Sequence, residues 1–342
     1  MADWYVKEGK DSDVVLSTKA CIVRNIKGYN FLPRLDDNES KSLITTVDKA
    51  IDKSVFSGGF AEELDKTTVI RLIRQQILGR EGSWMANPQR KAFYFNDDAS
   101  VSIAVGASEH IAVRAMAQGN DTSVYDRAEQ VAINLESQLD IAFSDTYGFL
   151  TSNIRLAGTG FQMIYTVALP AIAKTEGGLA AIKQRVEQYE WSLTPFTERG
   201  ELANSNVFLI TSVNTLGVSE NDILKKGQML ISDIVKAERG CREEIVSKNK
   251  DQAEDIYCRS FGNLRYGTLM TRAEAISALS WLRLYHDYDD CGEIKCSWNK
   301  INKLTMEIMW EPAAPARRNP GSLVTSQKMR AKAIRTVLKG GE

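Results

Sequence analysis

The sequence contains little histidine and cysteine, with two histidines and five cysteines among 342 residues. So few histidines exclude a metal centre built from several imidazoles, and an odd number of widely spaced cysteines argues against a disulfide framework. Long apolar runs are also missing, and none approaches the roughly 20 residues that span a bilayer. The opening residues, MADWYVKEGKDSD, are charged and lack the apolar core of a signal peptide. We therefore expect a cytoplasmic protein that does not bind a membrane.

An excess of charge of one sign is absent as well. Lysine and arginine total 43 and aspartate and glutamate total 44, which leaves a formal net charge of −1. This balance provides no overall attraction to nucleic acid or to an anionic membrane surface, so neither partner is expected. The length allows two domains, or one large domain with an appendage.

One short stretch has some features of a metal site. Cys291 and Cys296 form a C-x4-C pair, with His286 upstream and aspartates at 287, 289 and 290 between them. Zinc ligands are usually closer together, and a second pair of cysteines is missing. Separate buried or surface thiols are the alternative interpretation, and we predict no metal.

Runs rich in Val, Ile and Phe alternate with amphipathic stretches along most of the chain. Strands are predicted at 14–26, 91–96, 101–106, 110–117 and 206–213. Residues 97–100 favour a hairpin between the second and third strands, and the fourth follows directly, which indicates an antiparallel meander. Helices are predicted at 38–54, 60–78, 123–143, 219–247 and 272–285, the last two with capping boxes at Ser219/Asp222 and Thr271/Glu274.

Strand patterns fade after residue 250, and helical patterns dominate from there on. We therefore predict an α+β protein with a mixed domain over 1–250 and a helical domain over 251–342. Residues 311–322, EPAAPARRNPGS, indicate a connector, because proline and glycine interrupt helices and strands. The basic segment after it is expected to form a short helix, either a solvated surface element or an anion-docking element.

Five segments together resemble the ATP:guanidino phosphotransferase family, most closely its bacterial protein-arginine kinase branch. The resemblance is collinear over about residues 11–340. It rests on SDVVLSTKACIVRNIKGYNF (12–31), VSIAVGASEHIAVRAMAQG (101–119), YGFLTSNIRLAGTGFQMIYTVALPAIA (147–173), NVFLITSVNTLGVSENDILKKGQMLISDIVKAERGCRE (206–243) and YCRSFGNLRYGTLMTRAEAISALSWLRL (257–284). It implies a phosphagen-kinase-like catalytic domain, with a largely antiparallel sheet flanked by helices, and a C-terminal helical domain.

Phosphoryl transfer to a guanidinium requires cations that neutralise the nucleotide phosphates and the transferring group. The resemblance implies that arginines from separate segments do this together with magnesium. In this sequence the five arginine positions are occupied by one lysine and four uncharged residues: Lys19, Cys21, Ala112, Gln162 and Thr194. Lysine keeps the charge but loses the planar fork that binds phosphate through two hydrogen bonds.

The reaction also requires a carboxylate, because the pKa of a guanidinium lies far above 7. The adjacent glutamates of the family correspond here to Ala107 and Ser108, and its reactive cysteine to Asn153. Glu109 is a candidate substitute. In a continuous strand, however, residue 109 would point to the face opposite Ser108 and lie about 6.6 Å along from Ala107.

A relocated set of cations is the alternative. Arg114 lies two residues beyond Ala112 on the same strand face, and Arg155 and Arg199 occur in segments that match the active site. These arginines could bind a nucleotide or another anion, or they could be structural. The turn at 158–160, Gly-Thr-Gly, follows the family pattern and is explained by backbone geometry alone.

The C-terminal helix corresponds to a segment that binds phosphoarginine in the protein-arginine kinase branch. Its motif corresponds to Ser326, Gln327, Met329, Arg330 and Ala331, and only the last two follow the pattern, which weakens the case for docking. The resemblance also implies dimerisation through the helical domain. Trp281, Leu282 and Leu284 are candidates for that contact or for the core.

The preferred hypothesis is a catalytically degenerate protein-arginine kinase homologue that acts as a binding or regulatory subunit. It would form a homodimer or pair with an active homologue, and no cofactor is expected. The alternative is an active ATP-dependent protein-arginine phosphotransferase with a rearranged site, which would use ATP and Mg²⁺. A third hypothesis is an anion sensor that uses the same cleft without ATP.

Overall fold

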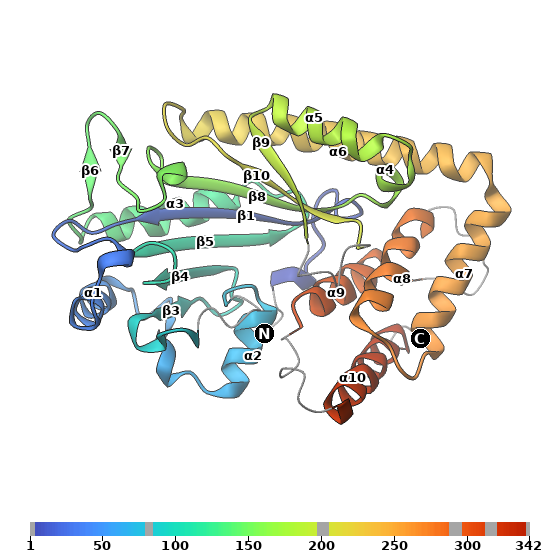
Figure 1. The fold of residues 1–342 in the computed structure, drawn as a ribbon, viewed down its shortest axis with the longest axis horizontal. Coiled ribbons are helices and arrows are strands. Elements are labelled where there is room, and N and C mark those ends of the chain that lie inside the picture. Colours follow the sequence, from blue (N-terminus) through green and yellow to red (C-terminus); the bar gives the residue numbers. More distant parts are fainter. Residues whose placement is uncertain (1–3, 79–84, 197–204, 287–295, 312–319, 340–342) are drawn as a thin grey trace.

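The computed structural model describes residues 4–78, 85–196, 205–286, 296–311 and 320–339. Its main feature is an eight-stranded antiparallel sheet in the order β2-β3-β4-β5-β1-β8-β10-β9 (Figure 1). In chain order these strands are β1 (Val15–Arg24), β2 (Ser57–Phe60), β3 (Ala92–Phe95), β4 (Val101–Val105), β5 (Ile111–Gln118), β8 (Phe161–Ala168), β9 (Trp191–Pro195) and β10 (Val207–Ser212). A separate hairpin pairs β6 (Phe143–Ser144) with β7 (Gly148–Phe149).

Four helices cover one face of the sheet. They are α1 (Asp37–Ala50), α3 (Val124–Glu136), α5 (Gly178–Gln188) and α6 (Glu220–Lys248). Their apolar side chains, such as Ile44, Ala128 and Ile231, form one core with Ile22 and Val113 from the strands. The spacing of these side chains buries one stripe of each helix and leaves the opposite stripe polar.

The opposite face of the sheet packs against α2 (Lys66–Arg74) and the C-terminal helices. These are α7 (Lys250–Tyr266), α8 (Arg272–Tyr285), α9 (Trp298–Met309) and α10 (Pro320–Lys339), which gather at one end of the sheet (Figure 1). The short helix α4 (Pro170–Lys174) contacts both α6 and α8. A second core joins strand residues Phe93 and Met116 to Leu282 and Leu304 of the helices.

A partly buried ionic network links the start of the chain to the helices. Asp13 accepts hydrogen bonds from Arg239 Nε and Arg242 Nη1, each at 3.0 Å. Arg283 is 2% exposed and donates to the Asp13 carbonyl at 3.3 Å. Burial alone would raise the pKa of Asp13, but the hydrogen bond from Arg239 and the charges of Arg242 and Arg239 outweigh it and hold that pKa below its usual value.

All five predicted strands and the antiparallel meander of β3, β4 and β5 are confirmed. Both predicted capping boxes are present: Ser219 Oγ accepts from the Asp222 amide at 3.1 Å, and Thr271 Oγ1 from the Glu274 amide at 3.1 Å. Each cap satisfies an amide that the first turn of a helix leaves without a partner.

Several predicted boundaries are wrong; α1, for example, ends at Ala50 and not at residue 54. Residues 57–60 form an edge strand, and α2 begins only at Lys66, because the Asp65 carboxylate caps the amides of Thr67 and Thr68. The helix predicted to residue 143 ends at Glu136, since Ile141 pairs with Ile26 instead. The connector predicted to residue 322 ends earlier, because α10 begins at Pro320, and proline is well suited to a first helical position.

The change from mixed to helical structure falls where the sequence predicts it. α6 ends at Lys248 and α7 begins at Lys250, but one core extends across this point. The division into two domains at residue 250 therefore stays a prediction. Within the described ranges, no helix is both long and apolar enough to cross a membrane.

Candidate functional site

A cleft of about 450 Å³ lies on the sheet face opposite α1, α3, α5 and α6. Its floor comes from β1, β5 and β8, and its rim from the residues after α2, the β4–β5 turn and Trp310 at the end of α9. The side chains around it are those of Lys19, Cys21, Val23, Gln76, Ile77, Leu78, Lys91, Phe93, Ala107, Ser108, Arg114, Leu156, Gln162, Ile164 and Trp310.

The strand register explains why distant residues meet here. Cys21 on β1 pairs with Arg114 on β5 and with Gln162 on β8. Directly paired residues of an antiparallel sheet point to the same face, and so do residues two apart on one strand. Lys19 therefore joins them, and six residues predicted for the site line this cleft: Lys19, Cys21, Ala107, Ser108, Arg114 and Gln162.

Lys19 lies on the floor, within the electrostatic influence of Arg114. Desolvation, and after it the charge of the Arg114 guanidinium, lower the pKa of the Lys19 amine to about 8, while Cys21 has the opposite influence. No carboxylate contributes to this balance. A positive charge held here without an anionic partner is costly, and an anionic ligand would offset that cost.

The other cations and amides of the cleft are held by backbone carbonyls. Arg114 Nη1 donates to the Ile77 carbonyl at 3.3 Å, and Lys91 Nζ donates to the Ala86 carbonyl at 2.6 Å. Gln162 Nε2 donates to the Ser212 carbonyl at 3.3 Å. These bonds fix the side chains, and a bond to a carbonyl leaves the charge of Arg114 in place, so Lys19 and Arg114 keep this part of the cleft positive.

No aspartate or glutamate is among the described residues that line the cleft. Ala107 and Ser108 lie at its rim, in the turn that joins β4 to β5. Gly106 begins this turn with a φ of +69°, and a side chain there would clash with the Arg90 carbonyl. Glycine adopts this conformation without strain.

Glu109 is completely buried and does not line the cleft. Its carboxylate accepts four hydrogen bonds: from Asn25 Nδ2 at 2.8 Å, the Ser152 amide at 2.9 Å, Ser152 Oγ at 2.8 Å and the Asn153 amide at 3.0 Å. The strand geometry that was used to orient residue 109 does not apply, since β4 ends at Val105 and β5 begins at Ile111. The orientation of the Glu109 side chain follows from this turn, and its carboxylate anchors the loop at 151–153.

His110 is equally buried and has a structural role in the same turn. Its Nδ1 accepts from the Ile26 amide at 3.0 Å, which places the proton on Nε2, 2.8 Å from the Asn30 carbonyl. Burial lowers the pKa of His110, although the bond to Asn30 opposes the shift. A neutral imidazole with both nitrogens occupied offers no acid or base to the cleft.

Other residues predicted for the site lie outside the cleft. Ala112 is fully buried and is not among the residues that line the cleft, and Asn153 caps the short 3₁₀ turn η6 (Ile154–Leu156). Arg155 is exposed on that turn. Thr194 is exposed on the edge strand β9. Arg199 lies outside the described residues.

Nine residues that line the cleft were not predicted for the site: Val23, Gln76, Ile77, Leu78, Lys91, Phe93, Leu156, Ile164 and Trp310. Gln76 lies within the helix predicted at 60–78 and Lys91 within the strand predicted at 91–96, and both segments were assigned only to secondary structure. Trp310 directly precedes the predicted connector, about 150 residues from Leu156. The one available signal was Lys91, a cation at the start of a predicted strand.

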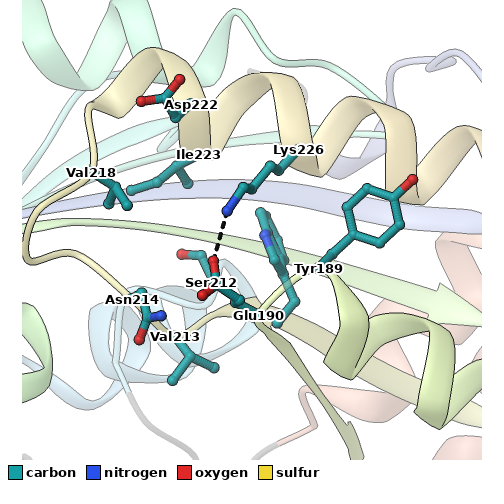
Figure 2. Close-up of a pocket in the computed structure, with 10 residues that line it drawn as sticks. Tyr189, Glu190, Ser212, Val213, Asn214, Val218, Asp222, Ile223 and Lys226 are labelled. Atoms are coloured by element: carbon teal, nitrogen blue, oxygen red, sulfur yellow. Dashed lines mark hydrogen bonds and ion pairs between the residues drawn. The ribbon is translucent and has the colours of Figure 1, made fainter.

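Two other cavities are less suited to a ligand. The first, lined by Trp191 and the residues in Figure 2, has a volume of about 10 Å³, and Lys226 there pairs with Glu190 at 2.6 Å. The second, about 560 Å³ near Trp4, contains Lys7 paired with Asp98 at 3.3 Å. Arg127 in this second cavity pairs with Asp121 at 3.5 Å, so charges there are largely matched.

The C-terminal candidates are engaged within the chain. Arg330 Nε donates to Glu311 at 2.7 Å and its Nη1 to the Met270 carbonyl at 2.7 Å, while Ser326 and Gln327 are half-buried on α10. Leu282 and Leu284 are fully buried, which confirms the core interpretation for both. Trp281 is half-buried, with the Lys174 amine 5.1 Å from its ring centre.

The possible metal site at the C-x4-C pair lies only partly within the described residues. Cys291 and the aspartates at 287, 289 and 290 lie outside them. Cys296 is buried, which raises the pKa of its thiol to about 11, and its carbonyl lies 2.7 Å from His286 Nε2. In the part of the chain that the structure describes, no group of three or more His, Cys, Asp or Glu residues could hold a metal ion.

Comparison with known proteins identifies relatives over nearly the whole chain. Similarity extends to protein-arginine kinases of Clostridium acetobutylicum (26% identity over 293 residues, 83% of this chain and 84% of that one) and Clostridium tetani (24% over 344 residues, 99% of each). The protein-arginine kinase of Bacillus cereus strain AH187 is 28% identical over 288 residues, or 83% of this chain and 81% of that one.

Solved structures support the fold. Lombricine kinase superposes with a TM-score of 0.59 at 15% identity, covering 68% of each chain. The duplicated taurocyamine kinase of Schistosoma mansoni gives 0.58 at 20% identity, covering 69% of this chain and 35% of that longer one. The model of the ATP:guanido phosphotransferase C-terminal catalytic domain matches residues 41–241, more than half of the 342 residues. The chain therefore belongs to the ATP:guanido phosphotransferase family.

Proposed function

We propose that this protein is a non-catalytic relative of the protein-arginine kinases that binds an anionic ligand and acts as a regulatory subunit. One observation carries the proposal: the cleft on the β1–β5–β8 face has cations on its floor and no described carboxylate in its lining. It is therefore suited to hold an anion and unsuited to deprotonate a guanidinium.

The missing base is the first argument. The residues nearest the expected position, Ala107 and Ser108, carry no carboxylate, and Glu109 is buried with four donors around its oxygens. Loss of a general base costs about 10²–10⁴ in rate. Moving Glu109 into the cleft would strand the amides of Ser152 and Asn153, whose hydrogen bonds anchor the loop.

The poor fit to Mg²⁺ and the reduced set of cations together form the second argument. The family implies ATP and Mg²⁺ for an active member, and Mg²⁺ takes carboxylate oxygens and water as ligands. The described residues that line the cleft supply no carboxylate, so this donor set does not fit the metal. A lost transition-state cation costs about 10³–10⁵ in phosphoryl transfer, although such losses do not add.

A rearranged, active site is the competing proposal, and one observation favours it: Lys19 and Arg114 line the same cleft. Two observations weaken it, because Arg155 is exposed outside the lining and Glu109 is engaged elsewhere. The two proposals differ in whether ATP is turned over.

The regulatory part of the proposal requires a protein partner, either a second copy or an active homologue. Leu282 and Leu284 lie in the core, so the contact must use other residues. Tyr266 and Met329, which are 76% and 67% exposed, provide apolar surface on α7 and α10. Sedimentation of the pure protein, alone and mixed with the Clostridium acetobutylicum relative, tests this part; unaltered monomers in both samples would contradict it.

The catalytic part is tested with ATP, Mg²⁺ and an arginine-rich protein, followed by detection of phosphoarginine by mass spectrometry. The Clostridium acetobutylicum protein-arginine kinase serves as the positive control. We expect no product from this protein above a mock preparation. Product that disappears in the Arg114→Ala variant would instead establish the rearranged site.

A further inference from the structure

The cleft has an excess of positive charge that no described lining residue balances. Lys19 comes from β1 and Arg114 from β5. Among the described residues, the ionisable neighbours that affect the charge of Lys19 are Arg114 and Cys21. Like charges brought together on a rigid sheet repel, and a bound anion relieves that repulsion.

Gln76 is an independent indication of a ligand. Its side chain is 6% exposed and lines the cleft, and its Nε2 has no hydrogen-bond partner. A buried donor without a partner is unfavourable and rare in native proteins. The residue also has a φ of +62°, a conformation that costs free energy for glutamine and that occurs preferentially at functional sites. A ligand acceptor would satisfy this amide.

Apolar side chains form the rest of the walls. Phe93, Ile164 and Leu156 lie in the lining, and Trp310 closes it from the end of α9. Trp310 packs edge-on against Phe196, with ring centres 5.7 Å apart, which holds it in place. A cavity of about 450 Å³ is within the range that accommodates small organic ligands.

We propose that the cleft binds a small organic phosphate without a metal ion, with the phosphate on Lys19, Arg114 and Gln76 and the organic group against Phe93 and Trp310. This inference rests on the proposed non-catalytic function and names the chemical class of its ligand. Magnesium weakens binding, because it neutralises the phosphate while the lining offers the metal no carboxylate. Since Trp310 belongs to the helical region, the ligand bridges that region and the sheet.

The probe is phenyl phosphate, titrated into the full-length protein by calorimetry in the presence of EDTA. We expect it to bind at least about tenfold more tightly than inorganic phosphate or phenol, because inorganic phosphate lacks the organic group and phenol lacks the phosphate. Addition of Mg²⁺ is expected to weaken the binding of phenyl phosphate. ATP is likewise expected to bind more weakly in Mg²⁺ than in EDTA.

Four variants assign the contacts. Arg114→Gln is expected to weaken phenyl phosphate binding about tenfold or more, as for loss of a charged hydrogen bond, whereas Arg114→Lys retains part of the affinity. Gln76→Gly removes the amide and accepts the positive φ, so it weakens binding about threefold to tenfold without straining the fold. Arg155→Gln, an exposed arginine outside the lining, is the matched control and leaves binding unchanged.

Three results with the wild-type protein would overturn the inference: equal affinity for phenyl phosphate and inorganic phosphate, equal affinity for phenyl phosphate and phenol, or binding that requires Mg²⁺. Unchanged affinity in Gln76→Gly would show that this residue does not contact the ligand, and it would also overturn the inference. Phosphoarginine formation, by contrast, contradicts the proposed function and is measured separately, so the two failures are distinguishable.

Discussion

Replacing Lys19 with methionine is predicted to stabilise the fold while weakening anion binding. Lys19 is held on the cleft floor beside Arg114, and desolvation, the larger cause, lowers its pKa from 10.5 to about 8. Such a fall corresponds to about 3 kcal/mol of preference for the neutral amine. At pH 7 the amine is nevertheless charged, so the folded protein carries most of this cost. Methionine removes the charge and keeps the length of the side chain.

We expect Lys19→Met to raise the free energy of unfolding by about 1–3 kcal/mol at pH 7, with the upper end reached only if the site does not relax. The pKa is lower in the folded than in the unfolded state, so the unfolded state binds more protons between pH 8 and 10.5. Stability of the wild-type protein therefore rises with pH in this window relative to the variant. At pH 9.5 the difference shrinks to about half.

Urea unfolding followed by circular dichroism at pH 7 and 9.5 measures this effect. Lys236→Met, on the exposed side of α6, is the matched control and is expected to show no pH-dependent difference. A Lys19→Met variant that is less stable than the wild type at pH 7, or a difference that does not change with pH, would refute the reasoning.

Three further changes test the structural roles assigned above. Glu109→Gln is expected to lower stability by about 2–4 kcal/mol in urea unfolding, since an amide nitrogen would face donors; a neutral effect would contradict the anchoring role. Asp13→Asn should destabilise by a similar amount near pH 7, and the difference should vanish in calorimetric scans as pH falls through the lowered pKa of Asp13. Gly158→Ala, at a φ of +102° and in contact with the Thr215 carbonyl, should lower the melting temperature by several degrees, and an unchanged one would contradict the strain.

The strands and helix starts were predictable because their causes are local. Alternating apolar residues predicted the strands β1, β3, β4 and β5. Ser219 and Thr271 marked the starts of α6 and α8. Helix ends were less predictable, because tertiary pairing decides them. The helical pattern continues through residue 141, for example, but Ile141 pairs with Ile26 and the helix ends before it.

The candidate site was partly predictable for the same reason. Family resemblance indicated Lys19, Cys21 and Gln162, and the register of β1, β5 and β8 brings them together. The roles of Glu109 and Gln76 were not predictable, since burial of the first and the left-handed backbone of the second arise from turns that no sequence period describes. Trp310 reaches the cleft only through packing of the helices.

The most direct test of the central claim is the amount of phosphoarginine formed by the purified protein with ATP and Mg²⁺. Under the same conditions the Clostridium acetobutylicum relative provides the reference rate. Because the base is missing, the account predicts a rate at least about 10²-fold below that reference, and undetectable if the cation losses also contribute. A rate within tenfold of the relative, abolished by Arg114→Ala, would contradict it.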